Sequence, residues 1–248
     1  MRTPVVRTRP KTIMEIGKEW DDIVPARQCA IEDGKDVSFS SVTAPCILRY
    51  IKEDLPSSVL DVGCGSGALS FRIAALIEKC VGIDISAKSI SIAKENYIRT
   101  NLTFINSEIR SFRYDTCFDA CVANMVFMSD PNWRESVRHL YEMLKVEGTL
   151  YLTITHPCFW ARYWEFENEE WFNYNEEIFL ESNFSISLKR NMGKSTYIHR
   201  PIANYFNGLV EEGFTLDLVE EPYPIQNTIP EYDYFYPRFL FIKCKKQN

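Results

Sequence analysis

The stretch that decides the fold is residues 59–67, which read Val59-Leu60-Asp61-Val62-Gly63-Cys64-Gly65-Ser66-Gly67. Its first half is rich in Val and Leu, which favour a short buried strand. Its second half has glycine at alternate positions, and glycine lets a backbone turn at positive φ and lie close to a ligand. Residues 68–77 follow with the apolar spacing of a helix. A strand, a glycine-rich loop and a helix in this order are typical of a nucleotide-type site in an open α/β sheet.

The glycine spacing separates the known kinds of nucleotide site. The chain has G-x-G-x-G preceded by an acid, whereas the dinucleotide fingerprint is G-x-G-x-x-G and a P-loop carries Lys and Ser or Thr after its last glycine. Residues 80–85 predict a second strand that ends in Asp84. In doubly wound sites an acid about 20 residues beyond the glycines accepts hydrogen bonds from ribose hydroxyls, so Asp84 is a candidate for that role. A Rossmann-like oxidoreductase is the alternative.

The two motifs LDVGCGSG and VGIDIS together resemble the first two motifs of class I S-adenosylmethionine-dependent methyltransferases. The resemblance runs from about Val59 to the C-terminus and is weakest across residues 157–200. It implies an α/β fold: a doubly wound, Rossmann-like, seven-stranded sheet with helices on both faces. It also implies S-adenosyl-L-methionine as cofactor and S-adenosyl-L-homocysteine as product. The residues that it places around the cofactor in the first two motifs are Asp61, Gly63, Cys64, Gly65, Gly67, Asp84 and Ile85.

The resemblance implies further cofactor contacts after the third and fourth predicted strands. Ser107-Glu108-Ile109 stands where many family members carry Gly-Asp-Ala, in which the acid binds the adenine amino group. Glu108 and Ile109 take that place, with a solvent-facing loop acid as the alternative for Glu108. Asn124 ends the predicted strand over residues 118–125 and would border the methionine moiety. The following Met125-Val126-Phe127 lacks both prolines of the Asn-Pro-Pro-Tyr motif of amino-group methyltransferases.

His156 is the candidate catalytic residue. It follows a predicted strand over residues 150–155, at the sheet edge where open α/β sheets place their ligands. Histidine titrates near neutral pH and can therefore act as a general base on a hydroxyl or amine acceptor. The alternative is that His156 orients a loop or bonds a backbone carbonyl.

Residues 157–200 interrupt the α/β pattern with many aromatic and acidic side chains, over a length too great for an ordinary connection. We expect an inserted lid that covers the acceptor pocket and holds a flat, apolar or cationic substrate. Trp160, His199 and Arg200 are candidate substrate-binding residues, and Arg200 could pair with a substrate carboxylate. A cap with its own small core, a dimer contact, or a helix-entry clamp at Arg200 are the alternatives.

The N-terminal region predicts cap helices over residues 12–24, ending at Pro25, and over residues 41–55, after a loose arm at residues 1–10. In the family, helices ahead of the first motif often cover the cofactor. Trp20, Arg27 and Phe39 are therefore candidates to line the acceptor pocket, with simple core packing as the alternative. The predicted division is residues 1–56 as cap helices, 57–156 and 201–248 as the cofactor-binding domain, and 157–200 as the inserted cap.

The composition of the chain limits the kinds of partner and location that we expect for it. The 248 residues carry a net charge of −6 without a basic stripe, so a nucleic-acid partner is not expected. None of the eight cysteines forms a C-x-x-C pair, so we expect no metal site and reduced thiols in the cytoplasm. No apolar run approaches the ~20 residues of a membrane span, and no secretory signal is expected. A monomer or a homodimer is expected.

The sequence thus predicts an enzyme that transfers a methyl group from S-adenosylmethionine to an O or N atom of a small-molecule acceptor. Two alternatives stay open at this point. One is a methyltransferase that acts on protein or RNA, and the other is a non-catalytic cofactor-binding protein.

Overall fold

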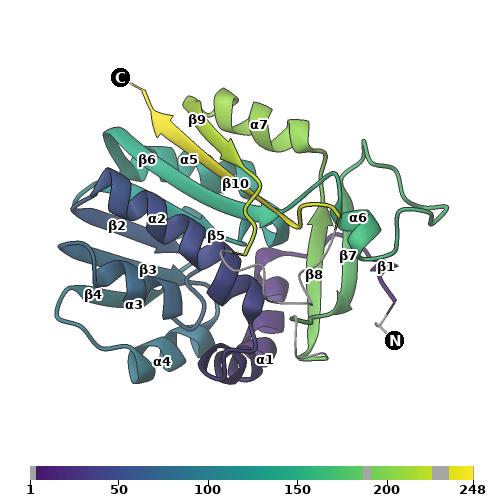
Figure 1. Cartoon of the computed structure of the whole chain (residues 1–248), viewed down its shortest axis with the longest axis horizontal. Helices are drawn as coiled ribbons and strands as arrows, with labels where there is room; N and C mark the ends of the chain where they lie inside the picture. The colour runs from purple at the N-terminus through teal and green to yellow at the C-terminus, as the bar shows by residue number, and fades with distance from the viewer. Residues whose placement is uncertain (1–3, 187–190, 225–234, 248) are drawn as a thin grey trace.

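The computed structural model describes residues 4–186, 191–224 and 235–247 (Figure 1). Its main feature is a seven-stranded sheet with the order β4-β3-β2-β5-β6-β10-β9. Strands β2 to β6 run parallel, and β10 is antiparallel to both of its neighbours, which confirms the predicted fold class. The strands are β2 Ser58–Val62, β3 Lys79–Asp84, β4 Leu102–Asn106, β5 Phe118–Asn124, β6 Leu144–Thr155, β9 Phe214–Glu220 and β10 Phe239–Lys246.

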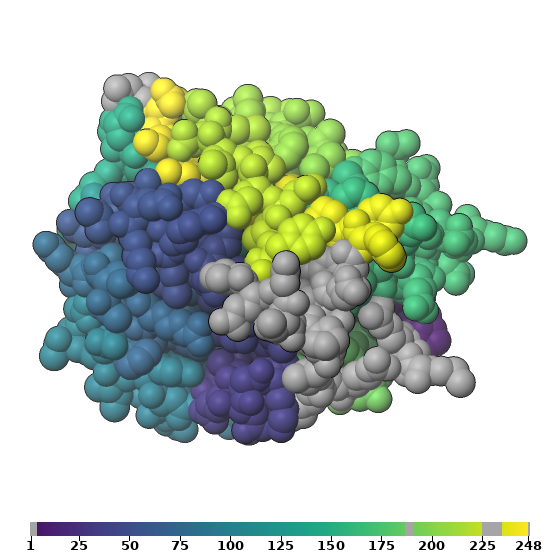
Figure 2. Space-filling view, in the orientation of Figure 1, coloured from purple at the N-terminus to yellow at the C-terminus, as the bar shows by residue number. Residues whose placement is uncertain are grey.

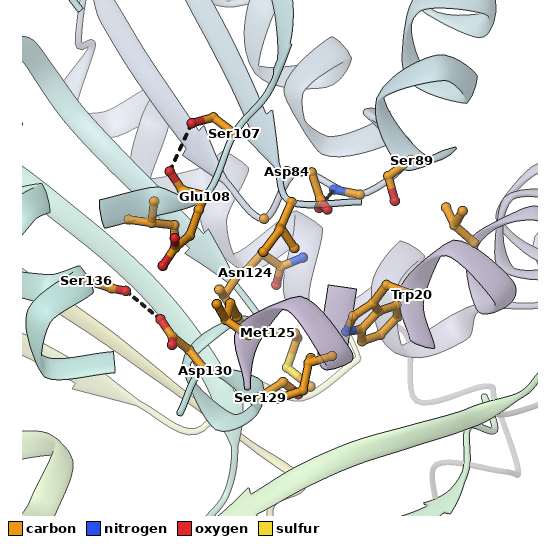
Figure 3. Close-up of a pocket in the computed structure, with 18 of the residues that line it drawn as sticks. Trp20, Asp84, Ser89, Ser107, Glu108, Asn124, Met125, Ser129, Asp130 and Ser136 are labelled. Carbon is orange, nitrogen blue, oxygen red and sulfur yellow. Dashed lines mark hydrogen bonds between the residues drawn. The ribbon is translucent and has the colours of Figure 1, made fainter. Parts of the chain in front are cut away.

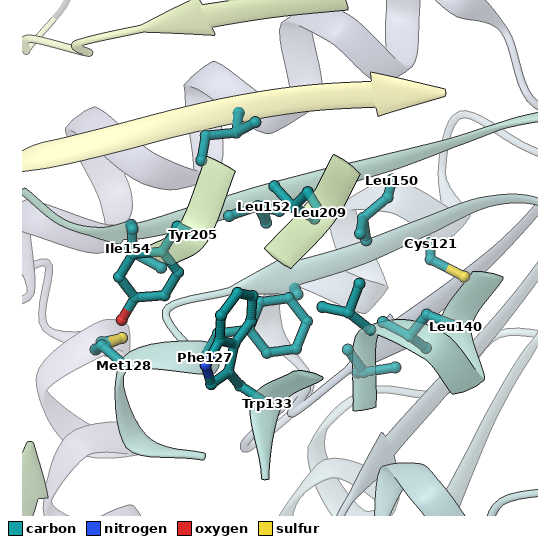
Figure 4. Packing of buried hydrophobic residues seen from close by; sticks show 14 of the residues in the cluster. Cys121, Phe127, Met128, Trp133, Leu140, Leu150, Leu152, Ile154, Tyr205 and Leu209 are labelled. Atoms are coloured by element: carbon teal, nitrogen blue, oxygen red, sulfur yellow. The ribbon is translucent and has the colours of Figure 1, made fainter. Parts of the chain in front are cut away.

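Helices cover both faces of this sheet because alternate side chains of the central strands are apolar on both sides. Val59 packs with α2 (Ala44–Asp54) and α3 (Ala68–Ala74), whereas Leu60 belongs to the cluster that includes side chains of α5 (Trp133–Met143) and α7 (Ile202–Glu211). Figure 4 shows Trp133, Tyr205 and Leu209 packed beside Leu152 of β6. The remaining short elements are α4 Ala87–Asn96, η2 Ile109–Ser111 and η3 Phe127–Ser129.

The N-terminal region is more ordered than the sequence predicts. Helix α1 (Ile13–Glu32) continues through Pro25, so the predicted end at that residue is wrong. An internal proline costs about 3 kcal/mol, and the buried side chains on either side, such as Ile23 and Ala30, offset that cost. The predicted loose arm is also wrong in part, because β1 (Val6–Arg7) pairs with the insert. The second predicted helix begins earlier, as a π-helical segment η1 (Ser38–Thr43) that leads into α2.

The insert forms a small antiparallel sheet in the order β1-β7-β8, with β7 at Ile178–Asn183 and β8 at Lys194–His199. A short helix, α6 (Trp160–Tyr163), precedes it. Figures 1 and 2 show the insert standing at one end of the molecule. Its buried side chains, among them Phe166 and Leu180, join the same hydrophobic cluster as β5 and β6. The insert therefore packs as a continuation of the main core.

No helix within the described residues combines the length and apolar character that crossing a bilayer requires. Within the same ranges, no three or more His, Cys, Asp or Glu side chains are arranged to hold a metal ion. All eight cysteines are free thiols.

Candidate functional site

A cleft of about 880 Å³, which includes its open mouth, lies where β2, β3, β4 and β5 end. We call it the strand-end cleft. Its lining comes from α1 and from the loops that follow these strands, and it includes Ile13, Ile16, Trp20, Val24, Arg27, Gly63, Gly65, Ser66, Asp84, Ile85, Ser107, Glu108, Ile109, Asn124, Met125, Val126, Ser129 and Asp130. Figure 3 shows Asp84, Glu108 and Asn124 gathered at the strand ends, with Trp20 approaching from α1.

The glycine loop contributes differently at its different positions. Gly65 has φ +55°, lines the cleft, and a Cβ built on it would meet nothing within 4 Å. Gly67 has φ +89°, and a Cβ there would stand 2.6 Å from the ring of Phe104. The described lining of the cleft does not include Gly67. Gly65 thus leaves the cleft open, whereas Gly67 allows close packing behind the loop.

Asp84 holds the loop and faces the cleft at the same time. Its Oδ2 accepts the Gly65 N–H at 2.8 Å, and its Oδ1 accepts the Ser86 N–H at 2.8 Å. Burial raises the pKa of this carboxyl from its ordinary value of 3.8 to about 6, against the opposing effect of the two hydrogen bonds. Each oxygen keeps a second lone pair with which it can accept a hydrogen bond from a ligand.

Glu108 and Asn124 line the cleft on either side of Asp84. The Glu108 carboxylate accepts the Arg110 Nε–H at 2.6 Å and keeps further acceptor capacity. The Asn124 Oδ1 accepts the Thr153 hydroxyl at 2.5 Å, which fixes the orientation of this amide. Apolar Ile85 and Ile109 line the same cleft. The arrangement can therefore accept hydrogen bonds from hydroxyl and amino groups beside an apolar ring.

Asp61 and Cys64 lie behind the loop rather than in the strand-end cleft. They line a smaller recess of about 340 Å³ that shares Gly63, Gly65 and Asn124 with the cleft. Asp61 is fully buried and accepts the Ser70 hydroxyl at 2.5 Å, and desolvation raises its pKa to about 7.

A second cavity of about 790 Å³, including its open mouth, adjoins the first. We call it the aromatic cavity. The two share Trp20, Arg27, Met125 and Ser129. Its aromatic lining residues are Trp20, Phe39, Trp160, Trp164, Phe184, Tyr197 and Phe239. The residues that the sequence proposes for an acceptor pocket, Trp20, Arg27, Phe39 and Trp160, thus lie together in one cavity.

Residues 59–148 match the family model described as a methyltransferase domain. The chain is 25% identical over 163 residues to a malonyl-[acyl-carrier protein] O-methyltransferase of Bacillus cereus, which covers 63% of this chain and 58% of that protein. A crystal structure from Listeria monocytogenes, provisionally described as an S-adenosylmethionine-dependent methyltransferase, superposes with a TM-score of 0.68 at 23% identity, over 83% of this chain and 98% of that one. Residues 59–148 thus match a methyltransferase domain, and the chain has the fold of the S-adenosylmethionine-dependent methyltransferases among its structural neighbours.

A second structural neighbour has two bound ligands. It is the Burkholderia thailandensis 1,6-didemethyltoxoflavin-N1-methyltransferase with 1,6-didemethyltoxoflavin and S-adenosylhomocysteine bound. It matches with a TM-score of 0.62 at 12% identity, over 99% of this chain and 95% of that one. At this identity the likeness shows the fold alone. The chain spans 58% and 44% of the length of the first two curated relatives that it matches.

His156 does not line either cavity in the described part of the methyltransferase domain. It is 3% exposed, its Nε2 lies 2.9 Å from the Glu221 carboxylate, and its Nδ1 accepts the Cys158 N–H at 3.2 Å. Burial lowers the pKa of His156, while Glu221 opposes that shift. These contacts favour the alternative in which the ring orients the loop after β6.

His199 and Arg200 are also absent from the described lining of both cavities. Arg200 is fully buried and donates to the carbonyl oxygens of Phe127 at 2.8 Å and Asp130 at 2.9 Å, and to the Glu177 carboxylate at 2.5 Å. The His199 Nε2 lies 3.0 Å from the Tyr174 carbonyl oxygen. The expectation that Arg200 faces a substrate carboxylate is therefore not met, because its guanidinium holds the loop after β5 instead.

The structure adds lining residues that the sequence does not single out. Met125 has φ +61° and its N–H donates to the Thr153 carbonyl oxygen at 2.9 Å, which holds its backbone at the junction of the two cavities. Asp130 is buried, accepts the Ser136 hydroxyl at 2.5 Å, and has its pKa raised by desolvation. The position of Asp130 a few residues beyond a strand end is a signal that could have found it.

Proposed function

We propose that this chain transfers the methyl group of S-adenosylmethionine to an O or N atom of a small-molecule acceptor. The observation that carries the proposal is that the two cavities adjoin and share lining residues. The strand-end cleft has hydrogen-bond acceptors suited to a nucleoside, and it shares Met125 and Ser129 with a cavity lined by aromatic side chains.

The residues present fit the cofactor. Asp84 would accept the ribose hydroxyls, Glu108 would accept the adenine amino group, and Ile85 with Ile109 would contact the adenine ring. The bare backbone at Gly65 leaves room for the methionine portion. When bound, the cofactor supplies an activated methyl group on a sulfonium.

The contribution of the chain to the reaction would be mainly positional. An acceptor in the aromatic cavity would meet the cofactor at the junction, and holding two reactants in line removes much of the entropic barrier to their reaction. Asp36 is the single carboxylate among the described lining residues of the aromatic cavity. Its Oδ2 is paired with Arg27 Nε at 3.2 Å, while its Oδ1 accepts the Phe39 N–H at 3.2 Å. We therefore assign orientation, rather than proton abstraction by His156, as the main contribution.

The relatives support methyl transfer as the reaction type, and they differ in the acceptors for which they are named. One is named for O-methylation of malonyl-[acyl-carrier protein] and another for N1-methylation of 1,6-didemethyltoxoflavin. A small group carried on a protein is therefore the second candidate acceptor. The net charge of −6 argues against a nucleic-acid acceptor. We also propose a reducing, cytoplasmic location on the basis of the eight free thiols, and a monomer or homodimer.

Calorimetric titration tests the class of ligand. We expect S-adenosylmethionine and S-adenosylhomocysteine to bind with micromolar affinity, and a nicotinamide dinucleotide not to bind. Binding of the dinucleotide alone would refute the proposal in favour of redox chemistry. Release of S-adenosylhomocysteine on adding an acceptor would then establish methyl transfer.

A further inference from the structure

We propose that the acceptor is an aromatic carboxylic acid and that Arg27 binds its carboxylate where the two cavities adjoin. The inference rests on the proposed function, because it names the substrate class for the aromatic cavity. Two observations carry it: the position and free donors of the Arg27 guanidinium, and the aromatic side chains that line the cavity beside it.

Arg27 lies on α1 and lines three neighbouring spaces. They are the strand-end cleft, the aromatic cavity and the recess that contains Asp61. Among the lining residues that the structure describes, no other residue is shared by all three, and no other Lys or Arg lines any of them. The guanidinium is therefore the positive charge that a bound anion would meet at this boundary.

Most of the hydrogen-bonding capacity of Arg27 is free for a ligand. Its Nε donates to the Asp36 Oδ2 at 3.2 Å, and in the described part of the chain no protein group accepts a hydrogen bond from either Nη. The side chain of Arg27 is 23% exposed. A guanidinium carries its N–H donors in a planar fork that matches the two oxygens of a carboxylate. The Nη–H groups are thus able to hold a carboxylate through two parallel hydrogen bonds.

The neighbours of the guanidinium place it on the acceptor side of the boundary. It lies 5.9 Å from the ring centroid of Trp20 and 5.8 Å from that of Phe184, and the two rings meet edge-on. Asp36 and Phe184 line the aromatic cavity and are not among the described residues that line the strand-end cleft. We therefore assign the carboxylate at Arg27 to the acceptor rather than to the cofactor.

The charges around Arg27 leave a place for one further anion. Asp36 is 2% exposed and accepts the Phe39 N–H with its other oxygen at 3.2 Å, so the backbone also stabilises its charge. The sulfonium of a bound S-adenosylmethionine would add a second positive charge on the cleft side of the boundary. A carboxylate between the guanidinium and the sulfonium would be attracted by both.

The rest of the acceptor would fill a space walled by aromatic rings. Trp160 of α6 lies 5.1 Å from Trp164 and 6.2 Å from Tyr197 between ring centroids, and all three side chains line the aromatic cavity. Aromatic rings prefer offset-stacked or edge-on contacts with another ring. The lining therefore suits a flat aromatic body better than a flexible aliphatic chain.

A carboxylate acceptor needs no general base. It is ionised at neutral pH, so no proton has to be removed before the transfer. A lone pair of one carboxylate oxygen forms the new bond to the methyl carbon as the carbon–sulfur bond breaks, and the bonding electrons return to sulfur. The products are a methyl ester and S-adenosylhomocysteine. This chemistry fits a cavity in which the one carboxylate among the described lining residues, that of Asp36, is paired with Arg27.

The test compares cinnamate with cinnamamide, which is a neutral analogue of the same shape. Binding to protein saturated with S-adenosylhomocysteine is measured by ligand-observed NMR at neutral pH. We expect cinnamate to bind about tenfold more tightly, the size expected for a hydrogen bond between charged groups, and Arg27→Met should remove this preference. Arg49→Met is the matched control. Arg49 also pairs with one acid, Glu220, and lies 4.6 Å from the ring centroid of Tyr50, but it is not among the described lining residues of either cavity.

A second comparison separates the acceptor from the cofactor as the source of the carboxylate. Methylthioadenosine has the nucleoside and the sulfur of S-adenosylhomocysteine but lacks its amino-acid carboxylate. If Arg27 binds the acceptor, Arg27→Met should weaken the binding of both nucleosides to the same small extent in calorimetry. A selective loss of S-adenosylhomocysteine binding would assign Arg27 to the cofactor and overturn the inference.

Three other results would overturn the inference. Equal binding of cinnamate and cinnamamide to the unmodified protein, or no binding of either, would rule out the carboxylate. Tighter binding of octanoate than of cinnamate would rule out the aromatic body. An unchanged cinnamate preference in Arg27→Met would rule out Arg27. The probe comparisons on the unmodified protein need no variant, so they decide the matter even if Arg27→Met fails to fold. Failure of S-adenosylhomocysteine to bind to the unmodified protein would instead refute the proposed function, which keeps the two failures distinct.

Discussion

Replacing Asp84 by Asn removes one charge from the strand-end cleft with almost no change in shape. In the native protein both carboxylate oxygens are engaged, one by the Gly65 N–H and one by the Ser86 N–H. The amide can still accept one of these bonds, but its NH₂ group would face the other N–H. The substitution therefore weakens the loop attachment and removes the charged acceptor proposed for the ribose hydroxyls.

The expected loss of affinity for S-adenosylhomocysteine follows from these contacts. A hydrogen bond to a charged group contributes about 1.5–3 kcal/mol. At about 1.4 kcal/mol per tenfold, loss of one such bond predicts S-adenosylhomocysteine binding that is roughly 10- to 150-fold weaker. The fold itself should change less. The pKa of Asp84 lies above its ordinary value, so its ionisation opposes folding as pH rises from about 4 to 6, and Asn removes that cost.

Calorimetry with S-adenosylhomocysteine at several pH values checks this prediction. The ionised carboxylate is the binding form, and its pKa is raised to about 6, so affinity should be constant above about pH 7 and fall as pH drops below 6. The Asp84→Asn substitution should abolish the part of this fall that the carboxyl group causes.

Asp119→Asn is the matched control for Asp84→Asn. Asp119 also accepts a backbone N–H, that of Ser58 at 2.9 Å, but it lies near the start of β5, away from the cleft. Its substitution should leave binding of S-adenosylhomocysteine unchanged. If Asp84→Asn bound within twofold of the unmodified protein, the assignment of Asp84 would be refuted.

Three further substitutions separate binding, folding and chemistry. Gly65→Ala places a Cβ in the cleft at φ +55° and should weaken S-adenosylhomocysteine binding in calorimetry. Gly34→Ala, at φ +69° in an exposed turn, should lower only the stability, by about 1–2 kcal/mol. Equal effects of the two substitutions on binding would contradict the placement of Gly65 in the binding site. Arg200→Met removes the charged donor to the Phe127 and Asp130 carbonyl oxygens and should lower the free energy of unfolding in urea by about 3 kcal/mol or more, whereas Arg138→Met, at an exposed ion pair, should leave it nearly unchanged. A loss below about 1 kcal/mol at Arg200 would contradict its role as a clamp. His156→Gln should keep turnover close to normal once an acceptor is known, and a hundredfold loss of kcat in a folded variant, the size of a general-base contribution, would restore His156 as the base.

The position of the strand-end cleft could be predicted because it depends on local sequence. A strand followed by glycines and an acid at the end of the next strand are adjacent along the chain, and parallel strands bring their carboxyl ends to one edge. Asp84, Glu108 and Asn124 therefore lie where the motifs place them. Asp61 belongs to the same motif, but its side chain is buried behind the loop, because a strand alternates its side chains and the sequence does not tell which face a ligand covers. Gly67 comes after the strand and lies close to the ring of Phe104.

The acceptor side depends on contacts between distant segments, which periodicity does not reveal. Arg200 follows the insert in sequence, yet its guanidinium reaches back to the loop after β5. Pro25 is a helix-ending signal by local rules, and tertiary packing of α1 overrides it. Residues 6–7 have no strand signature of their own and become a strand because β7 offers an edge. Trp160, which the aromatic density of the insert singles out, does line the aromatic cavity, and its role in substrate binding stays a prediction.

The most direct test of the account is a crystal structure with S-adenosylhomocysteine bound. We predict the nucleoside in the strand-end cleft, with its ribose at Asp84, its adenine between Ile85 and Ile109, and its sulfur at the Met125–Ser129 junction with the aromatic cavity. A ligand bound elsewhere, or one whose sulfur faces away from the aromatic cavity, would contradict the account.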